Sequence, residues 1–241
     1  MVVASHRRPA QRLWDSLFAE GLRLMRERLT VYCIFAAGCA FAAWVAAPRV
    51  DFYDVLAAHP GALVRTPPVS VVLALALAAL FFILPSALRR IDPSFRMTPL
   101  RTVVAIVTLA SVGAITELGY ALAVLPGIAA AVLLSQALVG ALLRTRDGAR
   151  AREIPGVFVG SLRGSVAMTQ GHVASTLGVL VASLGIILVP FALALLVLAI
   201  AGAAVPPSLV LTAPLLFLTF VYFECVRYAL IVRWYRRLAG R

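Results

Sequence analysis

The stretch TVVAIVTLASVGAITELGYALAVLPGIAAAVLLSQALVGALL, from Thr102 to Leu143, decides the fold of this chain. It holds 42 residues, of which only Glu117 is charged. A helix rises about 1.5 Å per residue and a hydrocarbon layer is about 30 Å thick, so the stretch is much too long for one crossing. Pro126 and Gly127 near its middle are typical of a turn. We therefore expect two transmembrane helices, at roughly 102–124 and 126–143, joined as a tight hairpin.

Four further apolar stretches flank this hairpin, at roughly 30–47, 69–88, 173–201 and 208–232. Apolar residues make up 62% of the chain, and its mean hydropathy is +0.98, both beyond an ordinary soluble core. The stretches are apolar on every side instead of alternating with polar residues, which favours helices over barrel strands. We expect an all-α polytopic integral membrane protein with six transmembrane helices in a single membrane domain, residues 1–241.

The arginines alternate between the connections of these predicted spans. All 22 basic residues are arginine, and 20 of them lie before the first span, in 89–101, in 144–172 or after 226. The positive-inside rule then places both termini in the cytoplasm. An all-arginine composition favours a bacterial cytoplasmic (inner) membrane. The net charge of +12 predicts anionic lipid headgroups as partners and no nucleic acid, because no basic helix face or aromatic stacking pattern accompanies it.

Two cytoplasmic segments are expected to form interfacial amphipathic helices. In the N-terminal segment 1–29, apolar residues fall mostly on one face of a helix at 10–29, which predicts a membrane anchor or, alternatively, a docking surface for a soluble partner. In the connection 144–172, a helix at 154–171 carries Gly156, Gly160 and Gly164 along one stripe. That helix is expected to pack within the molecule or to contact a partner. Residues 233–241 are predicted to be a basic cytoplasmic tail.

Polar residues inside spans are the candidate site residues, because a charge at mid-bilayer costs about 2.5 to 3.5 kcal/mol on insertion scales. Glu117 is interpreted as hydrogen-bonded to a neighbouring helix or as a substrate or proton site. Glu224 and Arg227 are three residues apart on one helix face, within pairing distance. They form an internal ion pair or, in the alternative, contact a lipid headgroup or a polar substrate.

Other chemistry is not indicated. The sequence has no recognisable nucleophile, zinc-peptidase or phosphate-loop motif, so we expect no enzyme activity, catalytic residue, metal or cofactor. Cys33, Cys39 and Cys225 lie inside predicted spans and are interpreted as small apolar packing residues. Asp51, Asp54 and His59 share the one sizeable outer loop, but that spacing makes a poor cation site.

Two short motifs resemble a known group of membrane proteins. Leu125-Pro126-Gly127-Ile128 and, further on, Ser165-Val166-Ala167-Met168-Thr169-Gln170-Gly171 are similar to the "LPGI" and "S-x-x-L-T-x-G" segments of the glycerophosphodiester phosphodiesterase membrane-domain-like family. The segment 18–28 is similar to the helix that enters the first span of that family. The resemblance implies a six-helix bacterial membrane protein, and no catalytic residue carries over from it.

Three functions are therefore expected to compete, of which the least favoured, a membrane enzyme, would need several convergent polar groups in one pocket, and the sequence offers no more than two. The other two are as follows. The first is a non-enzymatic transport or membrane-lipid-handling component, which predicts a cavity that reaches Glu117. The second is a scaffold or accessory subunit that recruits a soluble cytoplasmic partner, which predicts a closed bundle with paired acids. Either function is compatible with a homo-oligomer.

Overall fold

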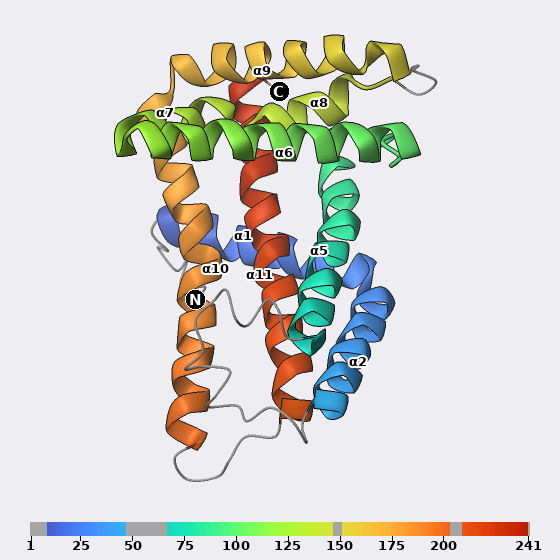
Figure 1. The fold of residues 1–241 in the computed structure, drawn as a ribbon. Helices are drawn as coiled ribbons and strands as arrows, with labels where there is room; N and C mark the ends of the chain where they lie inside the picture. The colour runs from blue at the N-terminus through green and yellow to red at the C-terminus, as the bar shows by residue number, and fades with distance from the viewer. Residues whose placement is uncertain (1–8, 47–66, 147–150, 203–208, 241) are drawn as a thin grey trace, which may run out of the picture. The chain divides into compact units, whose positions relative to one another are not determined.

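The computed structural model describes residues 9–46, 67–146, 151–202 and 209–240, and within these ranges the chain forms helices and no strand (Figure 1). In chain order the helices are α1 (Pro9–Glu27), α2 (Leu29–Ala46), α5 (Pro67–Leu88), α6 (Pro99–Leu122), α7 (Val124–Leu134), α8 (Ala137–Arg144), the short 3-10 helix η1 (Ala151–Glu153), α9 (Ile154–Gln170), α10 (Val173–Gly202) and α11 (Leu209–Leu238). The prediction of an all-helical chain is confirmed for these residues.

The chain divides into two compact units, each built from two separate segments. The first unit combines Met1–Ser86 with Gly185–Ala229, and the second combines Ala87–Leu184 with Leu230–Arg241. The helices α10 and α11 therefore contribute to both units.

In the first unit, α1 packs closely against α11. Leu17 and Leu24 are fully buried, and a Cβ atom added to Gly21 would lie only 3.0 Å from the Cα atom of Val226. The hydroxyl of Tyr222 also lies 3.5 Å from the carbonyl of Phe18. The predicted surface helix at 10–29 is thus a helix with a buried face, and it ends at a bend of 79° before α2.

Aromatic side chains connect α2, α5 and α11 within the same unit. The ring of Phe35 meets the ring of Phe82 edge-on with 5.8 Å between centroids, and it meets the ring of Phe217 at 6.4 Å. Such edge-to-face pairs stabilise packing beyond the apolar area that they bury.

In the second unit, α6 and α7 form the predicted hairpin. The turn is the single extended residue Ala123, so Pro126 and Gly127 lie in the first turn of α7, where proline is tolerated. The hairpin closes tightly, because a Cβ atom added to Gly119 would lie 2.9 Å from the Cα atom of Gly127. At the other end, the hydroxyl of Thr98 caps α6 by accepting a hydrogen bond from a backbone N–H.

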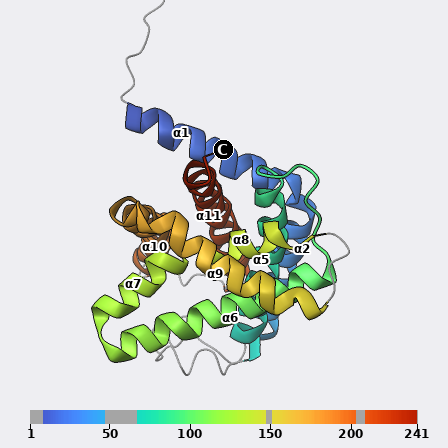
Figure 2. The same cartoon turned by 90° about the horizontal axis from the view of Figure 1, so that it is seen from above.

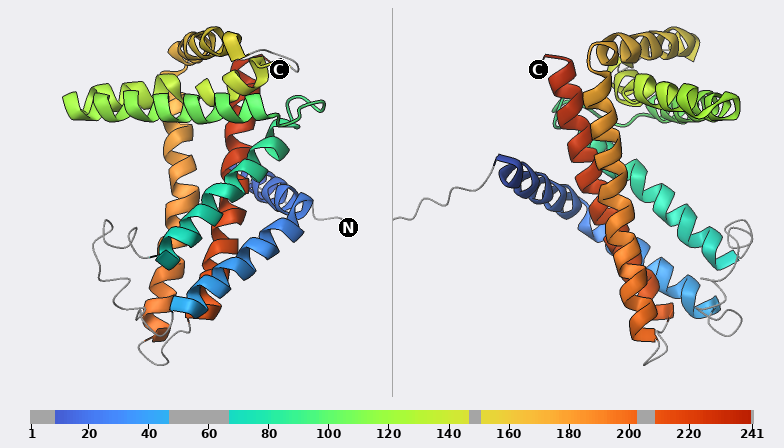
Figure 3. Two further views of the ribbon diagram at one scale, coloured as in Figure 1. Left: turned by 45° about the vertical axis from the view of Figure 1, so that its right-hand side comes forward. Right: turned by 90° about the vertical axis from the view of Figure 1, so that its left-hand side faces the viewer.

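The helix α9 forms a further layer of the second unit and lies over α7 and α8 (Figures 2 and 3). Within this unit, α6 runs across the first turns of α10 instead of along them (Figures 1 and 3). In this arrangement, α6 and the start of α10 therefore cannot both stand upright across the same membrane.

The described helices support the prediction of a helical membrane protein, but they do not confirm six spans. Four of the described helical stretches are long and apolar enough to cross a membrane, or five if α1 and α2 are taken together as one bent span. The predicted fourth span, 126–143, is divided between α7 and α8, and the sixth continues as α11 to Leu238. The basic tail predicted at 233–241 therefore begins as helix.

Candidate functional site

The apolar stretch Val124–Arg144 is interrupted at Ser135 and Gln136, where α7 ends and α8 begins. Neither residue is a proline or a glycine, so the sequence predicts a continuous helix here. The structure has a short break instead, although Val124–Arg144 remains one stretch that is long and apolar enough to cross a membrane. An interruption releases backbone N–H and C=O groups from their helical partners. In an apolar surrounding these groups need other partners, because an unsatisfied one costs several kcal/mol in hydrocarbon.

The helix α9 supplies those partners through one hydroxyl. Ser165 donates its Oγ hydrogen to the carbonyl of Leu133 at 2.6 Å, and the same Oγ accepts a hydrogen bond from the backbone N–H of Gln136 at 3.2 Å. A hydroxyl can both donate and accept, so one serine satisfies both sides of the interruption. Thr169 lies 3.3 Å from the Leu133 carbonyl but has a nearer acceptor, the carbonyl of Ser165, at 2.8 Å.

The buried face of α9 is polar. Ser161, Ser165 and Thr169 are spaced at four residues and are at most 1% exposed, whereas the apolar side chain of Val159 is 43% exposed. The outer side of α9 is mixed, because Arg163 and Gln170 are exposed on this helix together with Val159. The spacing of these hydroxyls is visible in the sequence, and it could have identified this face.

Gln136 is the unsatisfied member of the cluster. Its side chain is 2% exposed, and its Oε1 atom has no hydrogen-bond partner among the described residues. Its Nε2 atom lies 3.5 Å from the hydroxyl of Ser135, at the limit of a hydrogen bond. A buried acceptor without a donor costs about 1–3 kcal/mol, and an ordered water or a bound molecule commonly supplies the missing donor. The Oε1 atom is thus a buried acceptor with no donor among the described residues, and the hydroxyls of Tyr32, Ser86, Thr108 and Thr116 are likewise buried without a partner there.

A buried arginine fixes the open end of the hairpin. Arg101, which is 5% exposed, donates from Nε and Nη2 to the carbonyl of Thr145 at 3.1 and 2.8 Å, and from Nη1 to the carbonyl of Arg96. Its guanidinium carbon lies 4.6 Å from the ring centre of Phe95. Thr145 follows the last residue of α8, so a cation caps the carbonyl end of that helix, where it is favourable.

The helix α9 packs within the molecule, as one of the two expectations has it, and its glycine stripe lies against an arginine side chain. Arg144 of α8 donates from Nη1 to the carbonyl of Gly160, and a Cβ atom added to Gly164 would lie 2.9 Å from the Arg144 guanidinium carbon. Gly156 has open space around it. The stripe thus receives an arginine side chain, and the close contact to α7 and α8 is made by the hydroxyl stripe.

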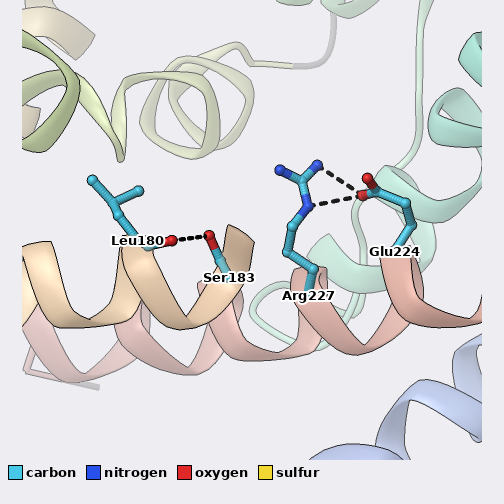
Figure 4. Close-up of polar contacts among 4 residues, drawn as sticks. All are labelled: Leu180, Ser183, Glu224 and Arg227. Atoms are coloured by element: carbon cyan, nitrogen blue, oxygen red, sulfur yellow. Dashed lines mark hydrogen bonds and ion pairs between the residues drawn. The ribbon is translucent and has the colours of Figure 1, made fainter. Parts of the chain in front are cut away.

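The structure brings together Glu224 and Arg227, as the spacing of three predicts. Arg227 donates from Nε to the Oε2 atom of Glu224 at 2.9 Å, and its Nη2 lies 2.7 Å from the same oxygen. Glu224 is 4% exposed. Figure 4 shows this pair. On α10, within the second unit, the hydroxyl of Ser183 donates to the carbonyl of Leu180 at 2.8 Å. The carboxylate is therefore paired inside α11.

Glu117 is the third candidate site residue from the sequence. It belongs to the second unit, whereas Glu224 and Arg227 belong to the first. Its side chain is exposed on α6, and no described residue hydrogen-bonds to it or pairs with it. The expected hydrogen bond to a neighbouring helix is not present among the described residues, and the alternative role as a substrate or proton site stays a prediction.

The remaining candidates from the sequence are the residues that could bind a metal ion and the cysteines. No group of three or more His, Cys, Asp or Glu residues gathers among them as a metal site would require. Asp51, Asp54 and His59 lie outside the described residues. Of the three free cysteines, Cys39 and Cys225 are buried and Cys33 is exposed.

Replacing Ser165 by alanine should destabilise the protein by about 1–3 kcal/mol, because the Leu133 carbonyl and the Gln136 N–H lose their shared partner. Thermal unfolding in detergent would measure this as a lower midpoint. Ser161→Ala is the matched control. Ser161 is equally buried, but its hydroxyl donates only to the carbonyl of Phe158 in its own helix, so the control should change little. Equal effects of both substitutions would contradict the assigned role of Ser165.

Comparisons of the chain with protein-family models, curated proteins and solved structures found no match.

Proposed function

We propose that the chain is a multi-pass membrane protein that serves as a non-enzymatic transport or membrane-lipid-handling component, with a polar ligand site at the interruption between α7 and α8. The observation that supports this proposal is the buried, unpartnered acceptor of Gln136 inside an apolar stretch long enough to cross a membrane. Interrupted helices at membrane depth are stable only where protein or a polar cavity covers them, and transporters use them to bind substrates and ions.

The proposal includes a topology of six spans with both termini in the cytoplasm of a bacterial cell. The distribution of arginine supports the placement of the termini. Glu117 is the one charged residue exposed on α6, and α7 has no polar side chain. These apolar surfaces support insertion in hydrocarbon, because a helix at an interface has a polar face. An alternative topology has four spans, α2, α5, α10 and α11, and places α6 to α9 in the plane of the membrane. The crossing of α6 and the start of α10 in the second unit favours it (Figures 1 and 3).

The similarity to the glycerophosphodiester phosphodiesterase membrane-domain-like family is part of the proposal. Its two motifs have structural roles here. Gly127 of the first motif makes room for the ring of Tyr120, which lies 2.2 Å from the position of an added Cβ atom. Ser165 of the second motif bridges the helix interruption. These are roles within this structure, and they do not imply a phosphodiesterase activity.

Native mass spectrometry of the full chain, extracted from its own membrane in a mild neutral detergent, tests the proposed function. We expect a specific small-molecule or lipid adduct on the wild-type protein. Gln136→Leu should reduce its occupancy about tenfold, because a buried hydrogen bond to the ligand is lost. Gln170→Leu, at the exposed end of α9, is the control and should retain the adduct. An adduct that survives in Gln136→Leu would contradict a site at the interruption.

A scaffold that recruits a soluble partner is the second candidate function. The observation that favours it is the exposed apolar face of α1, where the rings of Trp14 and Phe18 lie 6.2 Å apart and each side chain is 38% exposed. The same experiment discriminates between the two functions. A stoichiometric soluble protein that is lost from Trp14→Ala and retained by Gln136→Leu would support the scaffold and overturn the transport proposal.

A further inference from the structure

A small recess lies in the second unit where α10 begins and α11 ends. It has a volume of about 220 Å³, and it is lined by His172, Ser175, Trp234, Arg237 and Leu238. All of these residues belong to segments of the second unit. The recess is therefore formed within one compact unit, and it is large enough for a group the size of a lipid headgroup but smaller than a typical drug-sized site.

Trp234 gives the recess a fixed wall. Its side chain is 8% exposed, and its Nε1–H donates to the hydroxyl of Thr176 at 3.2 Å. The imidazole of His172 meets its ring edge-on, with 6.4 Å between centroids. The guanidinium carbon of Arg237 lies 5.7 Å from the ring centre. The ring of Trp234, which is fixed by the hydrogen bond of its N–H, thus has the Arg237 guanidinium and the His172 imidazole beside it at the recess.

The polar groups of the recess are suited to an anion. Arg237, His172 and Ser175 are exposed, and their side chains form no hydrogen bond with any residue that the structure describes. No acidic residue lines the recess. A guanidinium offers several N–H donors in the geometry that phosphate and carboxylate oxygens accept. The first turn of α10 begins beside His172 and adds the positive end of a helix dipole.

We propose that this recess binds a phosphate group, carried either by an anionic phospholipid or by a soluble phosphate. Phosphate presents several oxygens to converging donors, so Arg237, His172 and Ser175 can bind it together. A tryptophan beside arginines is typical of the headgroup level of a membrane. This inference adds a second site to the proposed function, and it does not depend on the interruption between α7 and α8.

Titration of the purified full chain with phosphatidylglycerol, read by native mass spectrometry in a neutral detergent, tests the inference. Arg237→Gln should weaken lipid binding about tenfold, as expected for the loss of a charge-assisted hydrogen bond. Arg236→Gln removes the same charge from the preceding residue of α11, which does not line the recess, and should weaken binding less than about twofold. Phosphatidylcholine should bind more weakly, because its choline group meets only cationic and neutral side chains.

Competition with inorganic phosphate separates the two sources of the anion. Displacement of the lipid by millimolar phosphate would assign the recess to a soluble phosphate, and retention of the lipid would assign it to a headgroup. Ser175→Ala gives a second, milder test, with binding expected to fall about threefold to fivefold. Equal weakening by Arg237→Gln and Arg236→Gln, together with an unchanged Ser175→Ala, would overturn the inference, because binding would then follow surface charge alone. The Gln136→Leu variant should bind phosphatidylglycerol normally, so failure of one proposal is distinguishable from failure of the other.

Discussion

Gly119→Leu should open the α6–α7 hairpin and destabilise the protein by about 3 kcal/mol, the upper part of the range for overpacking a closed contact. An added Cβ atom at this position would already lie 2.9 Å from the Cα atom and 3.0 Å from the N atom of Gly127. These are backbone atoms, so no side-chain rotation can relieve the clash. Helices in a membrane associate largely through close packing, and loss of this contact has no hydrophobic compensation. Reversible unfolding in mixed detergent micelles would measure the change.

Gly113→Leu is the matched control for this prediction. Gly113 lies on the same helix, and an added Cβ atom there has no neighbour within 4 Å. Leucine forms helices better than glycine does by roughly 1 kcal/mol, so the control should be unchanged or more stable. A Gly119→Leu protein as stable as the control would show that the hairpin does not close through Gly119 and Gly127.

A cysteine introduced as Leu125→Cys, in a variant whose three native cysteines are replaced by alanine, should be labelled from outside the cell by a membrane-impermeant maleimide. Leu125 is 78% exposed and lies beside the turn at Ala123. With six spans, this turn lies on the outer face of the membrane, and labelling should be close to complete. With four spans, the same turn lies on the cytoplasmic side and reacts only after the cells are permeabilised.

Ala151→Cys is the control for sidedness, because the connection that contains it is cytoplasmic in both topologies. It should react only in permeabilised cells. If Leu125→Cys is also labelled only in permeabilised cells, the six-span proposal is overturned, and the arrangement in which α6 to α9 lie in the membrane plane takes its place. The arginine distribution does not separate these two topologies, because the turn near Ala123 carries no arginine and all the arginine-rich segments stay on one side in both.

The sequence predicts most helix positions because the apolar stretches are long and are bounded by charged or turn-forming residues. The hairpin is an example, since its length and Pro126-Gly127 place the turn to within a few residues of Ala123. The pairing of Glu224 with Arg227 is likewise local, because residues three apart on a helix are neighbours. Both predictions depend only on residues close together in the chain.

The interruption at Ser135 and Gln136 could not be predicted in this way. Nothing local breaks the helix, and the hydroxyl that stabilises the break comes from Ser165, which lies on another helix. The same limit applies to Arg101, which sequence reasoning counts only as one cytoplasmic charge. Its contact with Thr145 depends on the hairpin returning α8 to the beginning of α6. Such sites follow from tertiary contacts that a single sequence does not reveal.

The close contact between Gly21 of α1 and Val226 of α11 has a consequence for biosynthesis. Chains emerge from the ribosome N-terminus first, so α1 is complete long before the surface that covers Leu17 and Leu24 exists. Until α11 has been made, these side chains need temporary cover from lipid or from the insertion machinery. A chain that ends before the last helix would leave this face of α1 without its native partner.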